Sequence, residues 1–163
     1  MKRNAIVCGL VAGAAGVAAM TLAEKVEQQF TGRPNSYVPG RTLKKLLRKP
    51  VVDEETPLGY NWAMHWGQGI LLGAVRAVMA DRGLRGPMGS FLHWNMRLLN
   101  DQTLENATGV GAPPWTWPLD QQIIDLIHKG IYAFTTGAVV DALVSGPAGI
   151  PEPRKPWLER SRA

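Results

Sequence analysis

The sequence predicts an all-α fold, in which a four-helix membrane bundle carries a short amphipathic surface helix. Four long segments have the apolar composition or the helical periodicity that this fold requires, and loops rich in Gly and Pro separate them. No stretch of alternating polar and apolar residues predicts a strand. Charged residues make up 19% of the chain, which is below the share of about 25% that is usual in soluble domains.

The first segment is uncharged from residue 4 to residue 22, and two basic residues, Lys2 and Arg3, precede it. A helix of this length can cross the hydrocarbon core of a bilayer. A cleaved secretory signal has a similar composition and is the competing interpretation. Because the helical register continues to Gly32 without a turn signal, we expect a retained helix over about residues 4–30.

Three further helices are expected over about residues 60–81, 87–107 and 118–145. Gly83 is a typical C-terminal stop for the first of them, and Pro87 suits the first turn of the next. Together with the first helix they define a single helical membrane domain over residues 1–146, and a basic, Pro-rich tail follows over residues 147–163. A soluble helical bundle is the alternative, because two of these helices carry several charged residues and the mean hydropathy is −0.08.

Two pairs of glycines have the GxxxG spacing, which lets helix backbones approach each other closely in lipid. The pairs are Gly9 with Gly13 in the first helix and Gly69 with Gly73 in the second. We therefore expect these two helices to pack on each other through their glycines. The single cysteine, Cys8, lies in the same apolar run, and one cysteine excludes an intramolecular disulfide.

A basic segment over residues 41–49 places leucines on one side of a helix and basic residues on the other. The basic residues are Arg41, Lys44, Lys45, Arg48 and Lys49. This pattern predicts a helix that lies on the bilayer surface and faces anionic headgroups; an ordinary surface helix of a soluble protein has the same pattern. We expect no nucleic-acid partner, because no helix-turn-helix, finger or RNA-binding motif accompanies these residues.

The basic residues also predict an orientation. The chain is basic overall, with a net charge of +5. With four spans, eight basic residues lie on the side of the N-terminus, the second loop and the C-terminus, against six in the first loop and none in the third. The positive-inside rule therefore places both termini in the cytoplasm.

The loop "GVGAPPWTWPLD", residues 109–120, holds two tryptophans, Trp115 and Trp117, and carries its one charge at the last position. Tryptophan favours the membrane interface, where its ring is buried and its N–H stays hydrated. We expect the loop to form a rigid interfacial cap between the last two helices. A lid over a cavity and a pair of rings that fills a soluble core are the alternatives.

Each of the last three helices carries one histidine within a stripe of polar residues. If the stripes face one another, they form a polar pocket inside an apolar bundle, and ionisable groups in a membrane segment mark a functional site. If they face water, or form only the local i,i+4 ion pairs of Arg97 with Asp101 and of Asp125 with Lys129, their role is structural. The candidate acid–base or charge-stabilising residues are His65, Arg76, His93, Arg97, Asp101, Asp125 and His128.

No metal site and no cofactor is expected. Asp125 and His128 have the i,i+3 spacing of a ligand pair, but a di-iron bundle needs two such pairs and two further carboxylates. Three functions remain: a membrane scaffold or transport-related protein, which could form a homo-oligomer; a membrane-embedded enzyme that acts on a lipophilic small molecule; and a soluble helical binding protein.

Three segments of the chain carry a resemblance. They are "TGRPNSYVPGRTL", "NWAMHWGQGILLGAVR" and "NDQTLENATGVGAPPWTWPLDQQIIDLIHKGIYA". They resemble segments of small uncharacterised helical proteins of actinobacteria and filamentous fungi, and the helix layout is similar to that of small bacterial inner-membrane proteins. The resemblance covers about residues 5–145. It implies a helical membrane protein and implies no activity or functional residue.

Overall fold

The computed structural model of the chain describes residues 5–52 and 54–145, and every regular element within these ranges is a helix. The all-α prediction is therefore confirmed. The elements in chain order are α1 (Ala5–Thr31), α2 (Val38–Leu46), α3 (Leu58–Asp81), α4 (Gly86–Ala107), the short 3-10 helix η1 (Pro114–Thr116) and α5 (Leu119–Ser145). The tail predicted over residues 147–163, like Lys2 and Arg3, lies outside the described residues.

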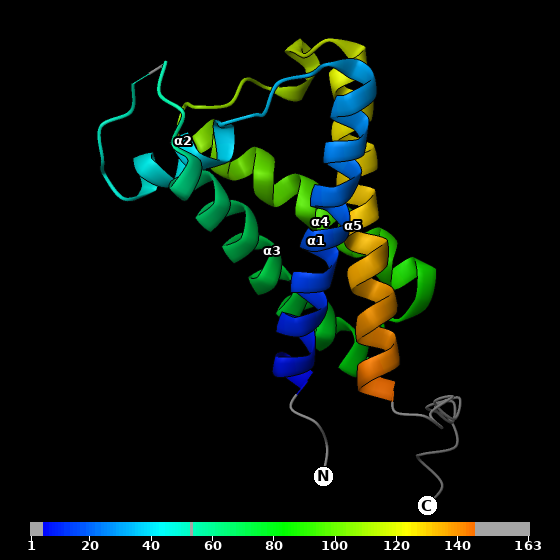
Figure 1. Cartoon of the computed structure of the whole chain (residues 1–163). Helices are drawn as coiled ribbons and strands as arrows, with labels where there is room; N and C mark the ends of the chain where they lie inside the picture. Colours follow the sequence, from blue (N-terminus) through cyan, green and yellow to red (C-terminus); the bar gives the residue numbers. More distant parts are fainter. Residues whose placement is uncertain (1–4, 53, 146–163) are drawn as a thin grey trace, which may run out of the picture.

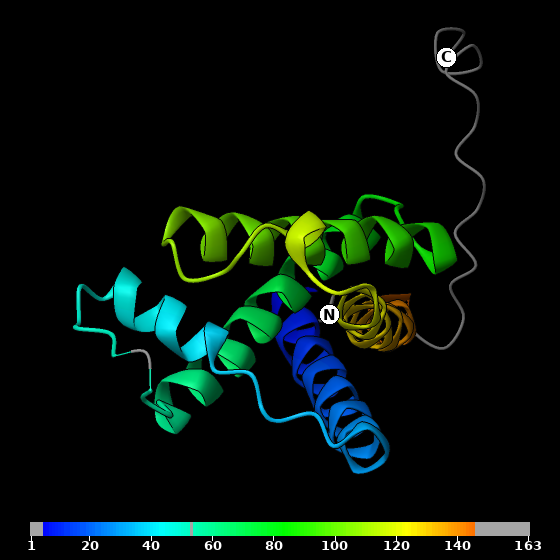
Figure 2. The ribbon, with the colours of Figure 1, turned by 90° about the horizontal axis from the view of Figure 1, so that it is seen from above.

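The four long helices do not share one axis direction. α1 and α5 lie side by side and antiparallel, α3 packs on α1, and α4 packs on α5 (Figure 1). Both α3 and α4 cross the α1–α5 pair obliquely, as the view from above in Figure 2 also shows. We call the end of the bundle at which α1 stops and α3 and α5 start the open end. The opposite end, which holds the turn between α3 and α4, is the closed end.

α1 meets α3 where glycines of the two helices face each other. A methyl group on Gly9 would lie 2.6 Å from the carbonyl oxygen of Gly73. One on Gly13 would lie 2.6 Å from the carbonyl oxygen of Gly69. A side chain at these positions would overlap the backbone of the neighbouring helix, because protein interiors are already close-packed. Gly16 has the same role toward α5, since a methyl group there would lie 2.9 Å from a carbonyl oxygen of that helix.

The apolar core is small and consists largely of short side chains. Toward the closed end, the buried cluster is formed by Ala12, Ala77, Ala80 and Val140. A second cluster near the middle of the bundle is formed by Val17, Met20, Tyr132 and Ala133. Short side chains in the core keep the helix axes close together, which agrees with the glycine contacts between α1 and α3.

Within the described residues, α1 and α5 are the two helices that are long and apolar enough to cross a membrane. Their most apolar 18-residue windows have mean hydropathies of 2.1 and 1.2. Of these windows, 39% and 33% are buried, so a large part of each helix faces outward. The large apolar side chains exposed on the two helices are Ile6, Val7, Val11, Leu22, Val26, Phe30, Leu119, Ile123, Leu126, Ile127 and Phe134.

The short helix α2 differs from the prediction in the side that it packs. The pattern placed the basic residues on the side opposite the leucines and predicted that they face headgroups, but Lys44 is buried and forms an ion pair with Glu55. Leu46, by contrast, is 48% exposed. The reason is Gly40, which touches the backbone of α3 and whose N–H donates a 2.9 Å hydrogen bond to the Asn61 side chain. This contact fixes the rotation of α2 about its own axis.

Candidate functional site

A cavity of about 790 Å³, the large cavity, lies at the open end. Its walls come from the C-terminal half of α1, the start of α3, the C-terminal half of α4 and the N-terminal half of α5. Loop residues 33–37 and 110–112 and the first residues of α2 form part of its rim. The oblique crossing of α3 and α4 separates the helices at this end (Figures 1 and 2). Small-molecule pockets commonly measure about 300–1,000 Å³, so the large cavity has the size of a ligand site.

Apolar and charged side chains share the lining of the large cavity. The larger apolar residues are Met20, Val38, Leu58, Trp62, Val110, Trp117 and Ile124. The charged residues are Glu24, Lys25, Arg33, Arg97, Asp101, Glu105, Asp125 and Lys129. Acidic and basic residues are equal in number, four of each. A molecule with a polar head and an apolar body therefore matches the lining better than a purely apolar or purely ionic one.

Four of these residues, Arg97, Asp101, Asp125 and Lys129, form one charged network between α4 and α5. The Asp101 carboxylate lies 3.1 Å from Arg97 Nε and 3.3 Å from Lys129 Nζ. Lys129 also donates a 2.8 Å hydrogen bond to Asp125. Gln68 of α3 donates a further hydrogen bond to Asp101. The two local i,i+4 pairs that the sequence suggested are thus both present, and the contact between Lys129 and Asp101 joins them.

Two of the three candidate histidines line the large cavity. His65 lies there with its Nε2 3.2 Å from the hydroxyl oxygen of Thr21, and His128 lines the α5 side. His93 does not reach it. That side chain is fully buried, with its ring centroid 5.5 Å from the ring centroid of Tyr132. Neither ring nitrogen of His93 has a hydrogen-bond partner in the described part of the chain. His93 is therefore a core residue and not part of the cavity.

Arg76 belongs to a different contact, near the closed end. Its Nη2 lies 2.9 Å from a carboxylate oxygen of Asp141, and its Nη1 donates to the carbonyl oxygen of Leu84. The N–H of Gly86 donates a 2.8 Å hydrogen bond to the same carboxylate. This arrangement joins α3, the start of α4 and the end of α5. It is a structural contact, and Arg76 is absent from the lining of the large cavity.

The two loop tryptophans take different positions. Trp117 lines the large cavity, and its Nε1 donates a 2.8 Å hydrogen bond to the carbonyl oxygen of Ala112. Trp115 is 81% exposed and does not line the cavity. The internal hydrogen bond fixes the Trp117 ring at the rim. Trp117 therefore lies at the rim of the large cavity, whereas Trp115 is not among its lining residues.

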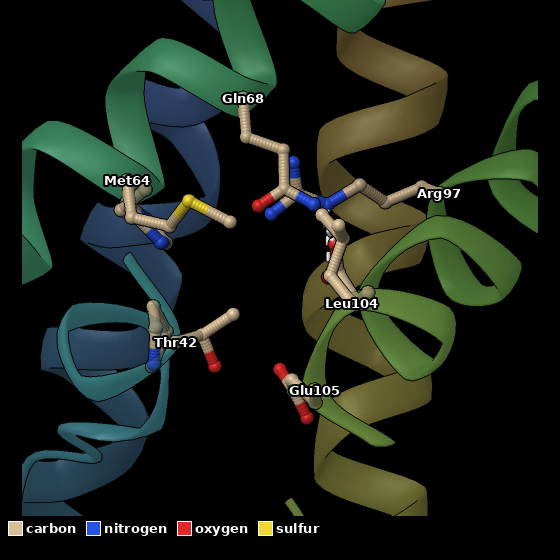
Figure 3. A pocket seen from close by; sticks show the side chains of 9 residues that line it. Thr42, Met64, Gln68, Arg97, Leu104 and Glu105 are labelled. Carbon is tan, nitrogen blue, oxygen red and sulfur yellow. Dashed lines mark hydrogen bonds and ion pairs between the residues drawn. The ribbon is translucent and has the colours of Figure 1, made fainter. Parts of the chain in front are cut away.

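A second pocket of about 20 Å³, the small pocket, lies between α2, α3 and α4 (Figure 3). Five residues line both cavities: Pro39, His65, Arg97, Asp101 and Glu105. The others around the small pocket are Thr42, Met64, Gln68 and Leu104. The small pocket is thus an inner extension of the large cavity. It exceeds the volume of about 10–15 Å³ that one water molecule needs.

Three polar groups around the small pocket stand out. Thr42 is fully buried, and its hydroxyl has no hydrogen-bond partner among residues 5–52 and 54–145. Arg97 is 4% exposed, and its Nη1 is equally without a partner in those ranges. Its Nε is close enough to Asp101 for an ion pair but is not aligned for a hydrogen bond. Glu105 is the third group, and its carboxyl points into the pocket (Figure 3).

Glu105 lies in the last turn of α4. It is therefore outside α1 and α5, the two helices that are long and apolar enough to cross a membrane. Burial raises the pKa of Glu105 from its ordinary value of 4.5 to about 7. The charge of Lys129 opposes this rise, and the carboxylate of Asp101 adds to it. A carboxyl group with a pKa near 7 is present in both protonation states at neutral pH, so it can donate or accept a hydrogen bond there.

Sequence reasoning missed Thr42 and Glu105. Glu105 follows Asp101 by four residues, so it lies on the same side of α4 as the predicted polar stripe. This spacing could have indicated it. Thr42 had no comparable signal, because it lies within a basic segment whose packed side depends on the Gly40 contact with α3.

Within residues 5–52 and 54–145, no group of three or more His, Cys, Asp or Glu side chains is arranged to hold a metal ion. Comparison with known proteins gave no assignment: no protein-family model, curated protein or solved structure matches the chain.

Proposed function

We propose that the chain is an integral membrane protein whose four long helices form one bundle, and whose large cavity binds a membrane-soluble small molecule for transport or presentation. The observation that carries this proposal is the combination of an apolar outer surface with a charged cavity at one end. An apolar surface needs lipid, and a charged cavity inside it needs a polar ligand. The soluble bundle in the sequence analysis accounts for the second feature but not for the first.

The outer surface of α4 supports the membrane location. Although α4 is less apolar than α1 and α5, the large side chains exposed on it are apolar. They are Met88, Phe91, Leu92, Met96 and Leu99. Together with the exposed side chains of α1 and α5, they cover several sides of the bundle. Soluble monomers rarely expose continuous apolar patches of more than a few hundred Å².

Aromatic and basic side chains at the open end support a membrane interface there. Phe30 and Trp115 are 85% and 81% exposed. Aromatic rings of this kind collect at the level of the lipid headgroups. On α2, Leu46 is exposed next to Lys45, so apolar and basic groups point outward together. We propose that this side of α2 lies on anionic headgroups, with the leucines inserted and the bases at the phosphates.

The charged network supports binding rather than chemistry. Ionisable side chains inside a membrane bundle commonly line pathways for substrates or ions. Here Arg97, Asp101 and Lys129 are held by one another, so none of them is a free acid or base. Held charges give a cavity a fixed pattern of donors and acceptors. Such a pattern selects ligands without reacting with them.

With both termini in the cytoplasm, as the charge distribution predicts, the large cavity opens on the opposite side of the membrane. A membrane-impermeant maleimide distinguishes the two orientations in whole cells. We expect labelling of Asn35→Cys, at the cavity rim, in a Cys8→Ala background. Labelling only after cell lysis would reverse the orientation and leave the binding proposal intact.

Binding is tested with the full chain in phosphatidylcholine nanodiscs and with 11-bromoundecanol, whose bromine quenches tryptophan on contact. We expect a saturable part of the quenching that decreases in Trp62→Phe and Trp117→Phe, because both rings line the cavity. Trp115→Phe is the matched control and should keep it. Quenching that rises only linearly with ligand in every variant would refute the binding proposal. Recovery of the chain from the aqueous fraction after a carbonate wash would refute the membrane location.

One contact favours a second candidate, a membrane-embedded enzyme that acts on a lipophilic ester. A hydroxyl group within reach of an imidazole is the arrangement of an activated nucleophile, and Thr21 and His65 have it inside the large cavity. The test is hydrolysis of 4-nitrophenyl decanoate by the protein in nanodiscs. Turnover that is lost in both Thr21→Val and His65→Asn would establish the enzyme. Equal rates in the two variants and the unmodified protein would exclude this pair.

A further inference from the structure

We infer that the small pocket binds the carboxylate head of a carboxylic-acid amphiphile whose alkyl chain lies in the large cavity. This inference rests on the proposed function, because it specifies the ligand class of the same cavity. Its evidence is separate, however: it comes from the unsatisfied hydrogen-bonding groups of Thr42 and Arg97 and from their position in the fold.

Arg97 has a donor group that no acceptor among the described residues satisfies. A guanidinium group only donates hydrogen bonds, and a buried donor is normally satisfied. Arg97 lies over the ring of Tyr132, with 5.2 Å between its central carbon and the ring centroid, and beside Asp101 through Nε. Its Nη1 is left without an acceptor in the described part of the chain. Asp101 cannot supply one easily, because Gln68 and Lys129 already occupy its oxygens.

Arg97 Nη1 belongs to a pocket that contains further polar groups. In Figure 3, Thr42 and Glu105 point toward each other across the small pocket, and Arg97 reaches in from α4. The Thr42 hydroxyl is a second buried group without a partner among the described residues. A volume of about 20 Å³ fits a flat group of a few atoms better than a tetrahedral phosphate. A carboxylate is such a group, and its two oxygens accept from Arg97 and Thr42 together.

The charges around the small pocket favour an anionic head. The network of Arg97, Lys129, Asp101 and Asp125 is neutral by itself, and the fixed charge of Arg97 disfavours a cationic head. Glu105 then decides whether an anion can enter. The groups that face Glu105 are Arg97 and Asp101 of α4, Asp125 and Lys129 of α5, and, from α3, His65 at the same pocket. Because the pKa of Glu105 is about 7, its carboxyl is mostly protonated at pH 6 and can donate to an incoming carboxylate.

The apolar part of the large cavity accommodates the alkyl chain. Trp62 and Ile124 belong to the apolar part of the large cavity, which meets the small pocket at Arg97. A head in the small pocket therefore leaves the tail against apolar side chains. Burial of each methylene group contributes to affinity, so the ligand must be an amphiphile and not a free short-chain acid.

The test compares probes that share one chain length: decanoate, decanol, decyltrimethylammonium and decyl phosphate. The full-length protein in phosphatidylcholine nanodiscs is titrated at pH 6, with saturable tryptophan fluorescence as the readout. We expect decanoate to bind at least about tenfold more tightly than decanol or decyltrimethylammonium. Equal binding of all four would overturn the inference and leave the proposed cavity function intact. No saturable binding of any probe would refute both, and tighter binding of decyl phosphate would overturn the choice of carboxylate.

Variants locate the head. Thr42→Val keeps the shape of the side chain and should weaken decanoate by about three- to tenfold, with decanol unchanged. Arg97→Gln should weaken decanoate by more than tenfold. If Arg97→Gln fails to fold, the effect of Thr42→Val still tests whether the carboxylate head lies in the small pocket. Arg82→Gln is the matched control: Arg82 is exposed and lines neither cavity, so decanoate affinity should not change. Arg33→Gln, at the rim of the large cavity, tests the competing position of the head. Loss in Arg33→Gln with full affinity in Thr42→Val would place the head at the rim and overturn the inference.

The role of Glu105 has its own readout. We expect decanoate to bind several-fold more weakly at pH 8 than at pH 6, because ionised Glu105 repels it. In Glu105→Gln this difference should disappear, whereas Glu54→Gln, which removes an exposed carboxylate, should keep it. A pH dependence that persists in Glu105→Gln would belong to the ligand and would overturn the contact between Glu105 and the carboxylate.

Discussion

The closed end and the open end each contain a buried arginine, and the two are used differently. At the closed end, Arg76 donates to Asp141 and to Leu84, and the same carboxylate holds the start of α4. At the open end, Arg97 shares its carboxylate with Lys129, and its Nη1 has no partner among the described residues. The Nε of Arg76 likewise has no partner there, but Arg76 lines neither cavity. A buried arginine is therefore not by itself a site. Its unsatisfied hydrogen-bonding capacity beside a cavity is what indicates one.

The backbone contacts differ in the same way. Toward the closed end, Gly9 and Gly73 bring α1 and α3 into direct contact, and small side chains fill the space beside them. Toward the open end, the same helices diverge and border a cavity of about 790 Å³. We therefore expect substitutions at the closed end to act mainly on stability, and those at the open end to act mainly on ligand binding.

The largest effect is expected for Gly73→Leu. A side chain there meets the backbone of α1 at Gly9 and Gly13, so the helices must separate. We expect a loss of about 3 kcal/mol or more in the free energy of unfolding, since overpacking at a backbone contact cannot be relieved by a rotamer change. Thermal unfolding in detergent measures it. Gly67→Leu, where a new side chain meets open space, is the control on the same helix. Similar melting temperatures for both variants would disprove the tight contact.

The next effect is expected for Asp141→Asn, which leaves the fully buried Arg76 without its charged partner. Breaking a buried pair from one side costs about 3–5 kcal/mol, and the partial exposure of Asp141 puts the value at the lower limit, about 3 kcal/mol. Urea or thermal unfolding gives the difference. Asp81→Asn, at an exposed position on α3, should change it little. Equal losses in the two variants would mean that the ion pair contributes nothing specific.

A smaller, pH-dependent effect is expected from Glu105. Its pKa is raised from 4.5 to about 7 in the folded chain, so the folded state binds more protons than the unfolded state between these values. The contribution of Glu105 to the free energy of unfolding should therefore be fully present below about pH 4.5 and should decrease as the pH rises to 7. Because the open cavity admits water, we expect a decrease of about 1–2 kcal/mol. Glu105→Gln should flatten the profile, while Glu54→Gln should not. A rise in stability over this range would contradict the burial of Glu105.

The smallest effect is expected in the loop before α5. Trp115→Ala should change stability in detergent by less than about 0.5 kcal/mol, because the ring is exposed. Trp117→Ala should cost about 1 kcal/mol, since it removes the hydrogen bond to Ala112. Thermal unfolding of the two variants side by side measures the difference. A larger loss in Trp115→Ala would show that the exposed ring has a contact of its own.

The sequence predicts the helices well because their signals are local. Apolar runs, Gly32 and Gly83 as stops, and Pro87 in a first turn all act within a few residues. The same locality explains why helical spacing groups Arg97 with Asp101 on one side of α4, where the structure places both at the cavity. It also indicates which glycines can pack, since the spacing of Gly69 and Gly73 is a local property.

Other features depend on contacts between distant segments, and the sequence does not predict them. Arg76 and Arg97 each lie in a polar stripe, and only the packing of α5 separates their roles. Thr42 reaches the small pocket because Gly40 docks on Asn61, which is 21 residues away along the chain. The burial of Lys44 follows from the same contact. Amphipathicity places Lys44 opposite Leu46 but does not indicate which of the two side chains is buried.

The rotation of α2 has a mechanical consequence. This nine-residue helix carries Thr42 at the small pocket and Leu46 one turn later on the same side, where the helix ends and the side chain is exposed. A helix this short moves as one rigid lever, with the Gly40 contact as its pivot. Any displacement of Thr42 by an occupant is therefore transmitted to Leu46. If Leu46 contacts lipid, occupancy of the pocket and attachment to the bilayer must change each other's affinity by the same factor, as thermodynamic linkage requires.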